Sequence, residues 1–130
     1  MNEFRYRLVM IIDDMFTDRY IMEHYIRKNN FAEKIISKES AFSALDYLKE
    51  NINNNENLPQ IIFLDIRMPQ MDGFEFLDEY EKLPASFHSS CRIVMLSSTI
   101  NPKDHQRIKN NPKVIKFVNK PFNNEGLNGI

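Results

Sequence analysis

Four short, largely apolar runs, each followed at once by polar side chains, constrain most strongly what this 130-residue chain can fold into. Apolar runs of this length are typical of buried parallel strands. Because ligands bind beyond the carboxyl ends of the strands in an open parallel sheet, we expect the polar side chains to share one site. The runs and the side chains that follow them are Leu8–Ile12 with Asp13 and Asp14, Ile61–Leu64 with Asp65, Ile93–Leu96 with Ser97, and Val114–Asn119 with Lys120.

Composition and charge exclude several classes of protein. With 42% apolar and 27% charged residues, the chain has the make-up of one globular domain. The net charge of −1 gives no electrostatic reason to bind nucleic acid or a membrane surface. Cys91 is the single cysteine, so the sequence predicts no internal disulfide and fits a reducing compartment. Without a membrane-spanning apolar stretch or a signal-peptide pattern at the start, the sequence favours a cytoplasmic location.

Helix-like segments separate the strands. Apolar residues recur at helical spacing after Thr17, Ser40 and Gly73, and the Ser40 side chain suits an N-cap. A weaker strand, Glu33–Ser37, lies between the first two of these helices. This alternation of strands and helices predicts an α/β fold, a doubly wound five-stranded parallel sheet with helices on both faces.

A further helix is expected after the strand that ends at Ser97. Asn101 is suited to an N-cap, proline follows at the first helical position, and Asp104 stands at the capping-box position. This helix carries few apolar residues, chiefly Ile108. A helix with little to bury is held weakly, so we expect it to be the mobile one.

The expected site suits a divalent metal and a phosphoryl group. Clustered carboxylates such as Asp13 and Asp14 repel one another unless a cation is bound, and magnesium prefers oxygen ligands. Asp65 is either a further metal ligand or a nucleophile that forms an aspartyl phosphate. Lys120 would neutralise charge on the transferred group, and the Ser97 hydroxyl would bond one of its oxygens.

Each of these residues alone has a simpler interpretation. A lone aspartate at a strand end is more often a helix N-cap than a ligand, and Asp14 fits that role. A lone serine or lysine is usually solvated surface. Four strand ends with complementary chemistry at one edge make the functional interpretation the stronger one.

These motifs, in this order, resemble those of the receiver domain of two-component response regulators. The most specific stretch is Leu64–Gly73, with the sequence Leu-Asp-Ile-Arg-Met-Pro-Gln-Met-Asp-Gly. The resemblance covers about residues 7–123, the core of a single domain over residues 1–130. It implies a flavodoxin-like sheet of strand order 2-1-3-4-5. It also implies a stand-alone protein similar to the chemotaxis regulators of this family.

The family's functional residues carry over one by one. The resemblance implies that Asp65 is the phosphoacceptor and that Mg²⁺ is the cofactor. A sensor histidine kinase or a phosphotransfer protein would supply the phosphoryl group. The domain would catalyse its own phosphorylation and slow autodephosphorylation without acting as an enzyme on other substrates. The implied metal ligands are Asp13, Asp14, Asp65 and the backbone carbonyl of Arg67; the implied switch and phosphate-binding residues are Ser97, Phe117 and Lys120; and the Lys120–Pro121 bond is the cis-peptide candidate.

The chain departs from the family pattern in several places. Ser97 replaces the commoner threonine, and Phe117 lacks the phenolic oxygen of tyrosine. Only nine residues follow Pro121, so the fifth helix is expected to be short or missing. Such a gap would leave an apolar sheet face partly uncovered, which would invite a partner helix or a homodimer. The Arg67 side chain is expected to point to solvent near the phosphate.

Two rival functions remain open at the level of the sequence. A phosphatase of the haloacid-dehalogenase type would also use an aspartate after a strand, but it carries a second aspartate two residues later, where this chain has Arg67. A non-signalling interaction module would keep the fold but not the full set of polar residues. No DNA-binding output domain fits in the residues given after Pro121. If the chain is complete, we expect output through protein contact or onward phosphoryl transfer; if it is a fragment, an output domain would lie outside it.

Overall fold

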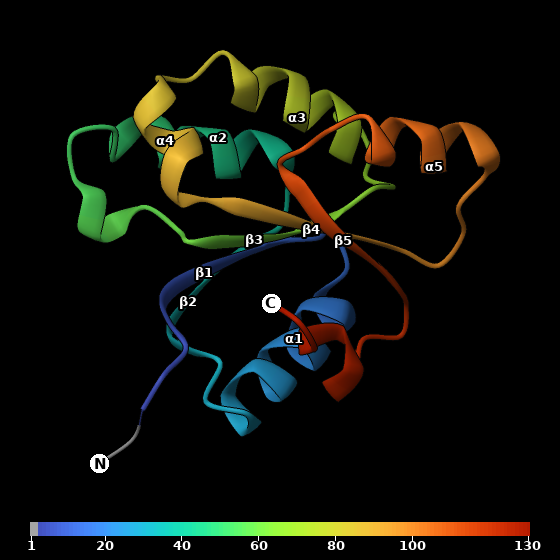
Figure 1. Cartoon of the computed structure of the whole chain (residues 1–130), viewed down its shortest axis with the longest axis horizontal. Coiled ribbons are helices and arrows are strands. Elements are labelled where there is room, and N and C mark those ends of the chain that lie inside the picture. The colour runs from blue at the N-terminus through green and yellow to red at the C-terminus, as the bar shows by residue number, and fades with distance from the viewer. Residues whose placement is uncertain (1–2) are drawn as a thin grey trace.

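The computed structural model describes residues 3–130 and contains a five-stranded sheet in which every neighbouring pair of strands is parallel (Figure 1). The strand order is β2-β1-β3-β4-β5, which confirms the predicted flavodoxin-like topology. The strands are β1 (Tyr6–Ile12), β2 (Ala32–Lys38), β3 (Ile61–Asp65), β4 (Arg92–Ser97) and β5 (Val114–Asn119).

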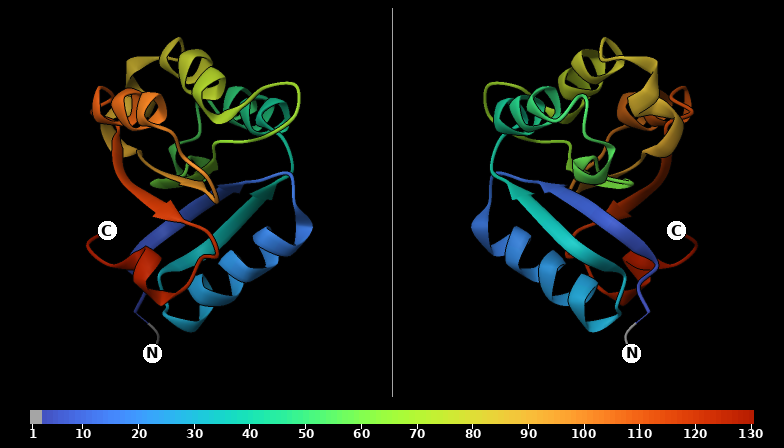
Figure 2. Two further views of the ribbon diagram at one scale, coloured as in Figure 1. Left: turned by 90° about the vertical axis from the view of Figure 1, so that its right-hand side faces the viewer. Right: turned by 90° about the vertical axis from the view of Figure 1, so that its left-hand side faces the viewer.

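Helices cover both faces of the sheet (Figure 2). One face carries α1 (Phe16–Lys28) and a 3₁₀ turn, η2 (Asn124–Leu127); the other carries α2 (Ala41–Glu50), α3 (Gly73–Glu81), α4 (Ala85–Ser90) and α5 (Pro102–Lys109). A second 3₁₀ turn, η1 (Asn55–Asn57), precedes β3. Within residues 3–130, no helix has the length and apolar content that crossing a membrane would require.

Helix α4 was not predicted from the sequence. It has six residues, of which Phe87 is the buried one, so it gives no periodic apolar signal. It lies between α3 and β4, and the helix predicted after Asn101 is therefore α5. Both members of that helix's predicted capping box are in place, because Asn101 Oδ1 accepts from the Asp104 N–H at 2.8 Å and Asp104 Oδ2 accepts from the Asn101 N–H at 3.4 Å.

The three central strands are buried on both faces. Alternate side chains of a strand point to opposite faces, so each strand contributes to two cores. Met10 of β1 and Ile62 of β3 pack toward α2 and α3, whereas Val9 and Phe63 pack toward α1. Burial on both faces explains why these strands appear in the sequence as continuous apolar runs.

As expected, no α-helix follows β5 in the described part of the chain, and the C-terminal segment with its short turn η2 covers β5 and α1. Phe122 and Ile130 are buried in the core on the α1 side, and Leu127 packs against it. Lys116 Nζ of β5 holds the segment by donating to the carbonyl oxygens of Glu125 at 2.8 Å and Asn128 at 2.9 Å. The expected opening in the sheet face is therefore filled by the chain itself, which removes the reason given above for a homodimer at this place.

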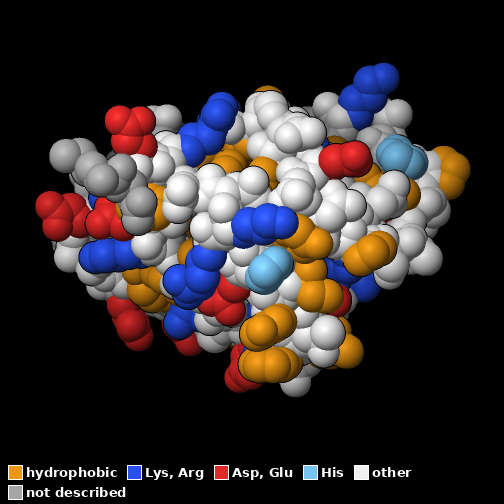
Figure 3. Space-filling model, turned by 90° about the horizontal axis from the view of Figure 1, so that it is seen from below, with side chains coloured by type: hydrophobic (Ala, Val, Ile, Leu, Met, Phe, Trp, Pro, Cys, Tyr) orange, Lys and Arg blue, Asp and Glu red, His pale blue; other side chains and the backbone are white. Residues whose placement is uncertain are grey.

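Apolar side chains nevertheless reach the surface on the α1 side of the molecule, where they lie among charged groups (Figure 3). Met15, which precedes α1, and Phe16 and Tyr20 in its first turns are exposed. The Arg19 guanidinium lies 5.7 Å from the centroid of the Phe16 ring. The start of α1 is thus partly apolar and partly cationic at its surface.

Gly73, the first residue of α3, fits a space that admits no side chain. A Cβ atom there would lie 2.6 Å from the Asp65 carbonyl oxygen and 3.1 Å from Met95 Cε. The Gly73 N–H donates to the Ile66 carbonyl oxygen at 2.9 Å. Close contact between the start of α3 and the end of β3 therefore depends on glycine at this position.

Substitution Gly73→Ala is expected to destabilise the fold by about 1–3 kcal/mol, because the new methyl group forces the ends of α3 and β3 apart. Urea denaturation measures the change. The exposed Asp78 on the same helix gives a matched control, since Asp78→Ala should change the stability by no more than about 0.5 kcal/mol. Equal stabilities of Gly73→Ala and the wild type would contradict the close contact.

Candidate functional site

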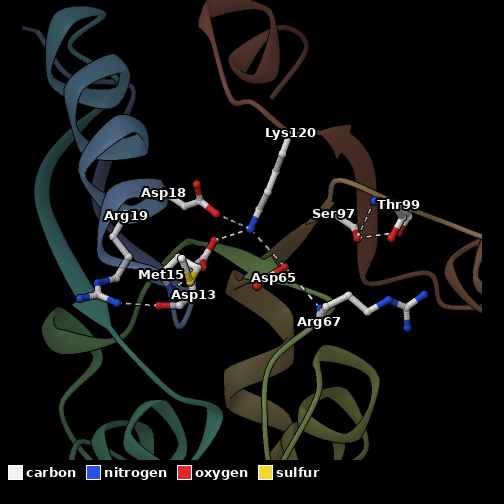
Figure 4. A network of polar contacts seen from close by, with 9 residues as sticks. All are labelled: Asp13, Met15, Asp18, Arg19, Asp65, Arg67, Ser97, Thr99 and Lys120. Carbon is white, nitrogen blue, oxygen red and sulfur yellow. Dashed lines mark hydrogen bonds and ion pairs between the residues drawn. The ribbon is translucent and has the colours of Figure 1, made fainter.

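The carboxyl ends of four strands bring the predicted polar residues together (Figure 4). Asp65 and Ser97 are the last residues of β3 and β4, while Asp13 and Lys120 each follow a strand closely. Backbone hydrogen bonds continue beyond the strand ends, from the Asp13 N–H to the Lys38 carbonyl at 3.1 Å and from the Lys120 N–H to the Ser97 carbonyl at 3.1 Å. The sheet thus fixes the backbone from which these side chains project.

The Lys120 ammonium group is the centre of the site. Its Nζ atom donates to Asp13 Oδ2 at 2.8 Å and to Asp18 Oδ2 at 2.9 Å, and it lies 3.3 Å from Asp65 Oδ1. The side chain of Lys120 is 14% exposed, and those of Asp13 and Asp65 are 0% and 4% exposed. An ammonium group has three N–H donors, so these three carboxylates match its full donor capacity.

Burial disfavours the ionised form of the carboxylates in the site. Burial, and then the charge of Asp13, raise the pKa of Asp65 to about 7, although Lys120 and the Arg67 N–H act in the opposite direction. Burial also raises the pKa of Asp13, against the hydrogen bonds from Lys120 and Met15. For Lys120, burial lowers the pKa, but the hydrogen bonds to Asp13 and Asp18 outweigh it, and the net shift is upward.

Three carboxylates form an acidic cluster that can hold a metal ion. One oxygen from each of Asp13, Asp14 and Asp65 lies within 4.8 Å of the other two. All the donors are oxygens, which is the set that a hard cation such as Mg²⁺ prefers. The raised pKa of Asp65 shows that one ammonium group does not fully compensate the buried charge. The residues therefore fit a divalent cation.

The backbone around the acidic cluster is also fixed. Asp13 Oδ1 accepts from the Met15 N–H at 2.9 Å, and the Arg19 guanidinium donates to the Asp13 carbonyl oxygen at 2.8 Å. On the other side of the site, the Arg67 N–H donates to Asp65 Oδ1 at 3.3 Å. The backbone of Arg67 thus lies beside the Asp65 carboxylate.

The Ser97 hydroxyl forms hydrogen bonds with the backbone of the loop that follows it. It donates to the Thr99 carbonyl oxygen at 2.6 Å and accepts from the Thr99 N–H at 3.2 Å. Phe117 is half-buried on β5 and lies edge-on against His105 of α5, with the ring centroids 6.0 Å apart. The Lys120–Pro121 peptide bond is cis.

Asp18 is a member of the site that the sequence analysis missed. It lies on the first turn of α1 and shares the Lys120 ammonium with Asp13. A signal for it exists in the sequence, because Asp18 stands four residues after Asp14 and residues at this spacing share a helix face. The signal is weak, since Asp14 lies before the helix begins.

The Arg67 side chain is exposed, as expected, but it also makes a contact that the sequence did not predict. Its guanidinium does not simply extend into solvent but forms an ion pair with Asp104 in the first turn of α5. The side chain of Arg67 is 47% exposed and that of Asp104 is 5% exposed. The residue two positions after Asp65 is therefore tied to a helix that follows a different strand.

The sheet order and the acidic cluster at its carboxyl edge together define a CheY-like domain of the flavodoxin type. The family model of the response regulator receiver domain matches residues 9–129. The chain belongs to this family, whose members act in two-component signalling.

Known proteins of the family are similar over most of the chain. The crystal structure of a two-component response regulator from Cytophaga hutchinsonii is 28% identical, with a TM-score of 0.86 over 94% of this chain and 91% of that one. Chemotaxis protein CheY of Bacillus subtilis is 30% identical over 69% of this chain and 66% of its own length. Sensor histidine kinase CheAY of Helicobacter pylori is 25% identical over 95% of this chain, which spans 14% of that protein.

In the absence of divalent cations, Asp65→Asn is expected to stabilise the fold more at pH 8 than at pH 5. The carboxyl group keeps its proton up to about pH 7 when folded but loses it near 3.8 when unfolded, so its contribution to stability is lost as the pH rises between these values. Asparagine stays neutral throughout. The free energy of unfolding of Asp65→Asn, relative to that of the wild type, should increase by about 1–3 kcal/mol from pH 5 to pH 8.

Urea denaturation in the presence of a chelator measures this difference. Asp46→Asn on the exposed face of α2 is the control, because its stability should follow that of the wild type at both pH values. An advantage of Asp65→Asn that is equal at pH 5 and pH 8 would contradict the raised pKa.

Proposed function

We propose that this chain is a phosphorylation-activated switch that accepts a phosphoryl group on Asp65. The donor is a sensor histidine kinase or a phosphotransfer protein, and the cofactor is Mg²⁺. The observation that supports this most directly is the placement of the Asp65 carboxylate, beside the other two acids of the acidic cluster and 3.3 Å from the Lys120 ammonium. A nucleophile, metal ligands and a cation for the phosphoryl group thus lie within one site.

In the proposed reaction a carboxylate oxygen of Asp65 attacks phosphorus, and the bond from phosphorus to the donor's histidine nitrogen breaks. Asp13, Asp14, Asp65 and the Arg67 backbone carbonyl would hold Mg²⁺, which neutralises charge on the phosphoryl oxygens when bound. Lys120 supplies its ammonium to a phosphoryl oxygen. Later attack by water on phosphorus would break the bond to the Asp65 oxygen, release inorganic phosphate and return the free carboxylate, so the domain catalyses changes to itself and not to another substrate.

Two side chains would carry the change away from Asp65. The Ser97 hydroxyl leaves Thr99 and donates to a phosphoryl oxygen, which moves the loop that leads directly into α5. Phe117, packed against His105 of α5, then turns inward. Phenylalanine has no hydroxyl group, so the new surface is defined by packing alone. A downstream protein must bind the phosphorylated form more tightly for this change to signal.

Residues 1–130 would form one receiver domain with its core at about 7–123. The domain would act in the cytoplasm, in keeping with its single, buried cysteine. Turnover of an external phosphate ester is disfavoured, because the position two residues after Asp65 holds an arginine tied to α5 and not a general acid. We therefore favour output through protein contact or onward phosphoryl transfer.

Incubation with acetyl phosphate and Mg²⁺ is expected to add the mass of one phosphoryl group, measured by intact-protein mass spectrometry. The gain should need Mg²⁺ and should be labile, as an acyl phosphate is. Asp65→Asn should abolish it, and the surface variant Asp46→Asn should keep it. A gain that persists in Asp65→Asn would place the acceptor elsewhere, and a folded wild type without any gain would count against the proposal.

A further inference from the structure

Asp104 is a buried acid that lies outside the acidic cluster. It is 4% exposed and sits in the first turn of α5. Its Oδ2 atom accepts from the Asn101 N–H and also pairs with the Arg67 guanidinium. A capping box alone does not require an arginine partner, so the ion pair is a separate feature of this chain.

Arg67 links this acid to the phosphoacceptor. Its main-chain N–H donates to Asp65 Oδ1 at 3.3 Å, and its side chain reaches Asp104. The side chain extends away from Asp65 and from Lys120 (Figure 4). One residue therefore contacts the acceptor carboxylate through its backbone and α5 through its guanidinium.

Building on the proposed phosphorylation of Asp65, we propose that Asp104 is a positioning residue for Arg67. In the unphosphorylated protein Asp104 holds the Arg67 guanidinium away from Asp65. When a phosphoryl group is added to Asp65, the guanidinium leaves Asp104 and binds a phosphoryl oxygen. The exchange couples the state of Asp65 to the start of α5 by a route that uses neither Ser97 nor Phe117.

The physical chemistry of the two partners favours this exchange. A guanidinium group matches the oxygens of a phosphoryl group with two parallel hydrogen bonds, and the phosphoryl group carries more negative charge than one carboxylate. The Arg67 side chain is half-exposed, so it can swing on its flexible stem, and its backbone is anchored two residues from the acceptor. The exchange needs no movement of the β3 backbone.

Departure of the Arg67 guanidinium from Asp104 would also affect α5. Asp104 would become a buried carboxylate without a cation, and such a charge is strongly destabilising where it is. The first turn of α5 must then shift until water reaches the carboxylate. Asn101 caps this turn, and the loop from Ser97 leads into it.

A second contact of α5 provides a matched control. The Arg107 guanidinium lies 3.9 Å from the centroid of the Phe74 ring on α3. Loss of this contact would weaken the packing of α5 but leave the pair of Arg67 and Asp104 in place. Arg107→Ala therefore separates general loosening of α5 from release of Arg67.

The test measures affinity for beryllium trifluoride, a stable mimic of the phosphoryl group, by fluorine NMR titration in the presence of Mg²⁺. Asp104→Asn keeps an oxygen for the cap but loses the charge that holds Arg67, so we expect it to bind the mimic about 3–10 fold more tightly than the wild type. In an Arg67→Ala background the same substitution should have no effect. Arg107→Ala should bind as the wild type does.

Several outcomes would overturn the inference. If Asp104→Asn raised the affinity for the mimic equally with and without Arg67, or if Arg107→Ala raised it by a similar factor, Asp104 would act only as a helix cap. No effect of Asp104→Asn, with the wild type binding the mimic and taking up phosphate from acetyl phosphate, would overturn this inference alone. A wild type that does neither would overturn the proposed function as well. Urea denaturation confirms that each variant is folded.

Discussion

The Lys120 ammonium group is the interaction on which the carboxyl edge of the sheet depends. Asp13 and Asp65 are fully or almost fully buried, and the charge of Asp13 adds to the cost of ionising Asp65. In this protein the ammonium group offsets that repulsion and ties the end of β5 to α1 through Asp18. A lysine placed at a strand end by the backbone is thus both a structural tie and a ready cation for an anionic ligand.

The same arrangement makes the site sensitive to any added charge. The buried charge is only partly compensated, so a divalent cation or a phosphoryl group changes the balance on which the edge rests. Two side chains next to this edge are held by contacts that can be exchanged. Ser97 is bonded to its own loop, and Arg67 is paired with Asp104. Both contacts lead toward α5, because the loop after Ser97 enters this helix and Asp104 lies in its first turn.

Much of this fold could be predicted from the sequence, because burial on both faces makes parallel strands visible as apolar runs. The polar residues that end those runs meet at one edge for the same geometrical reason. The capping box at Asn101 and Asp104 was also visible, since it depends on local spacing. Helix α4 was not, because a six-residue helix with one buried side chain leaves no periodic pattern.

Contacts between distant segments away from the strand ends were the part that the sequence could not predict. The pair of Arg67 and Asp104 joins residues that are 37 positions apart, and nothing local to either residue requires the other. The cover made by Phe122 and Ile130 likewise depends on the path of a segment that was expected to leave the sheet face partly uncovered. Both features are set by how elements pack and not by the pattern within an element.

The C-terminal cover has a consequence for the way the molecule opens. A 3₁₀ turn has few internal hydrogen bonds, and the segment around η2 is also held from outside, by Lys116 and by a hydrogen bond from Asn29 to Asn124. Segments of this kind unfold locally at a lower free energy than the strands beneath them. The α1 side of the core can therefore become transiently accessible to water while the central strands β1, β3 and β4 stay paired. Backbone amide hydrogens of the C-terminal segment would then exchange with solvent on a shorter timescale than those of the three central strands.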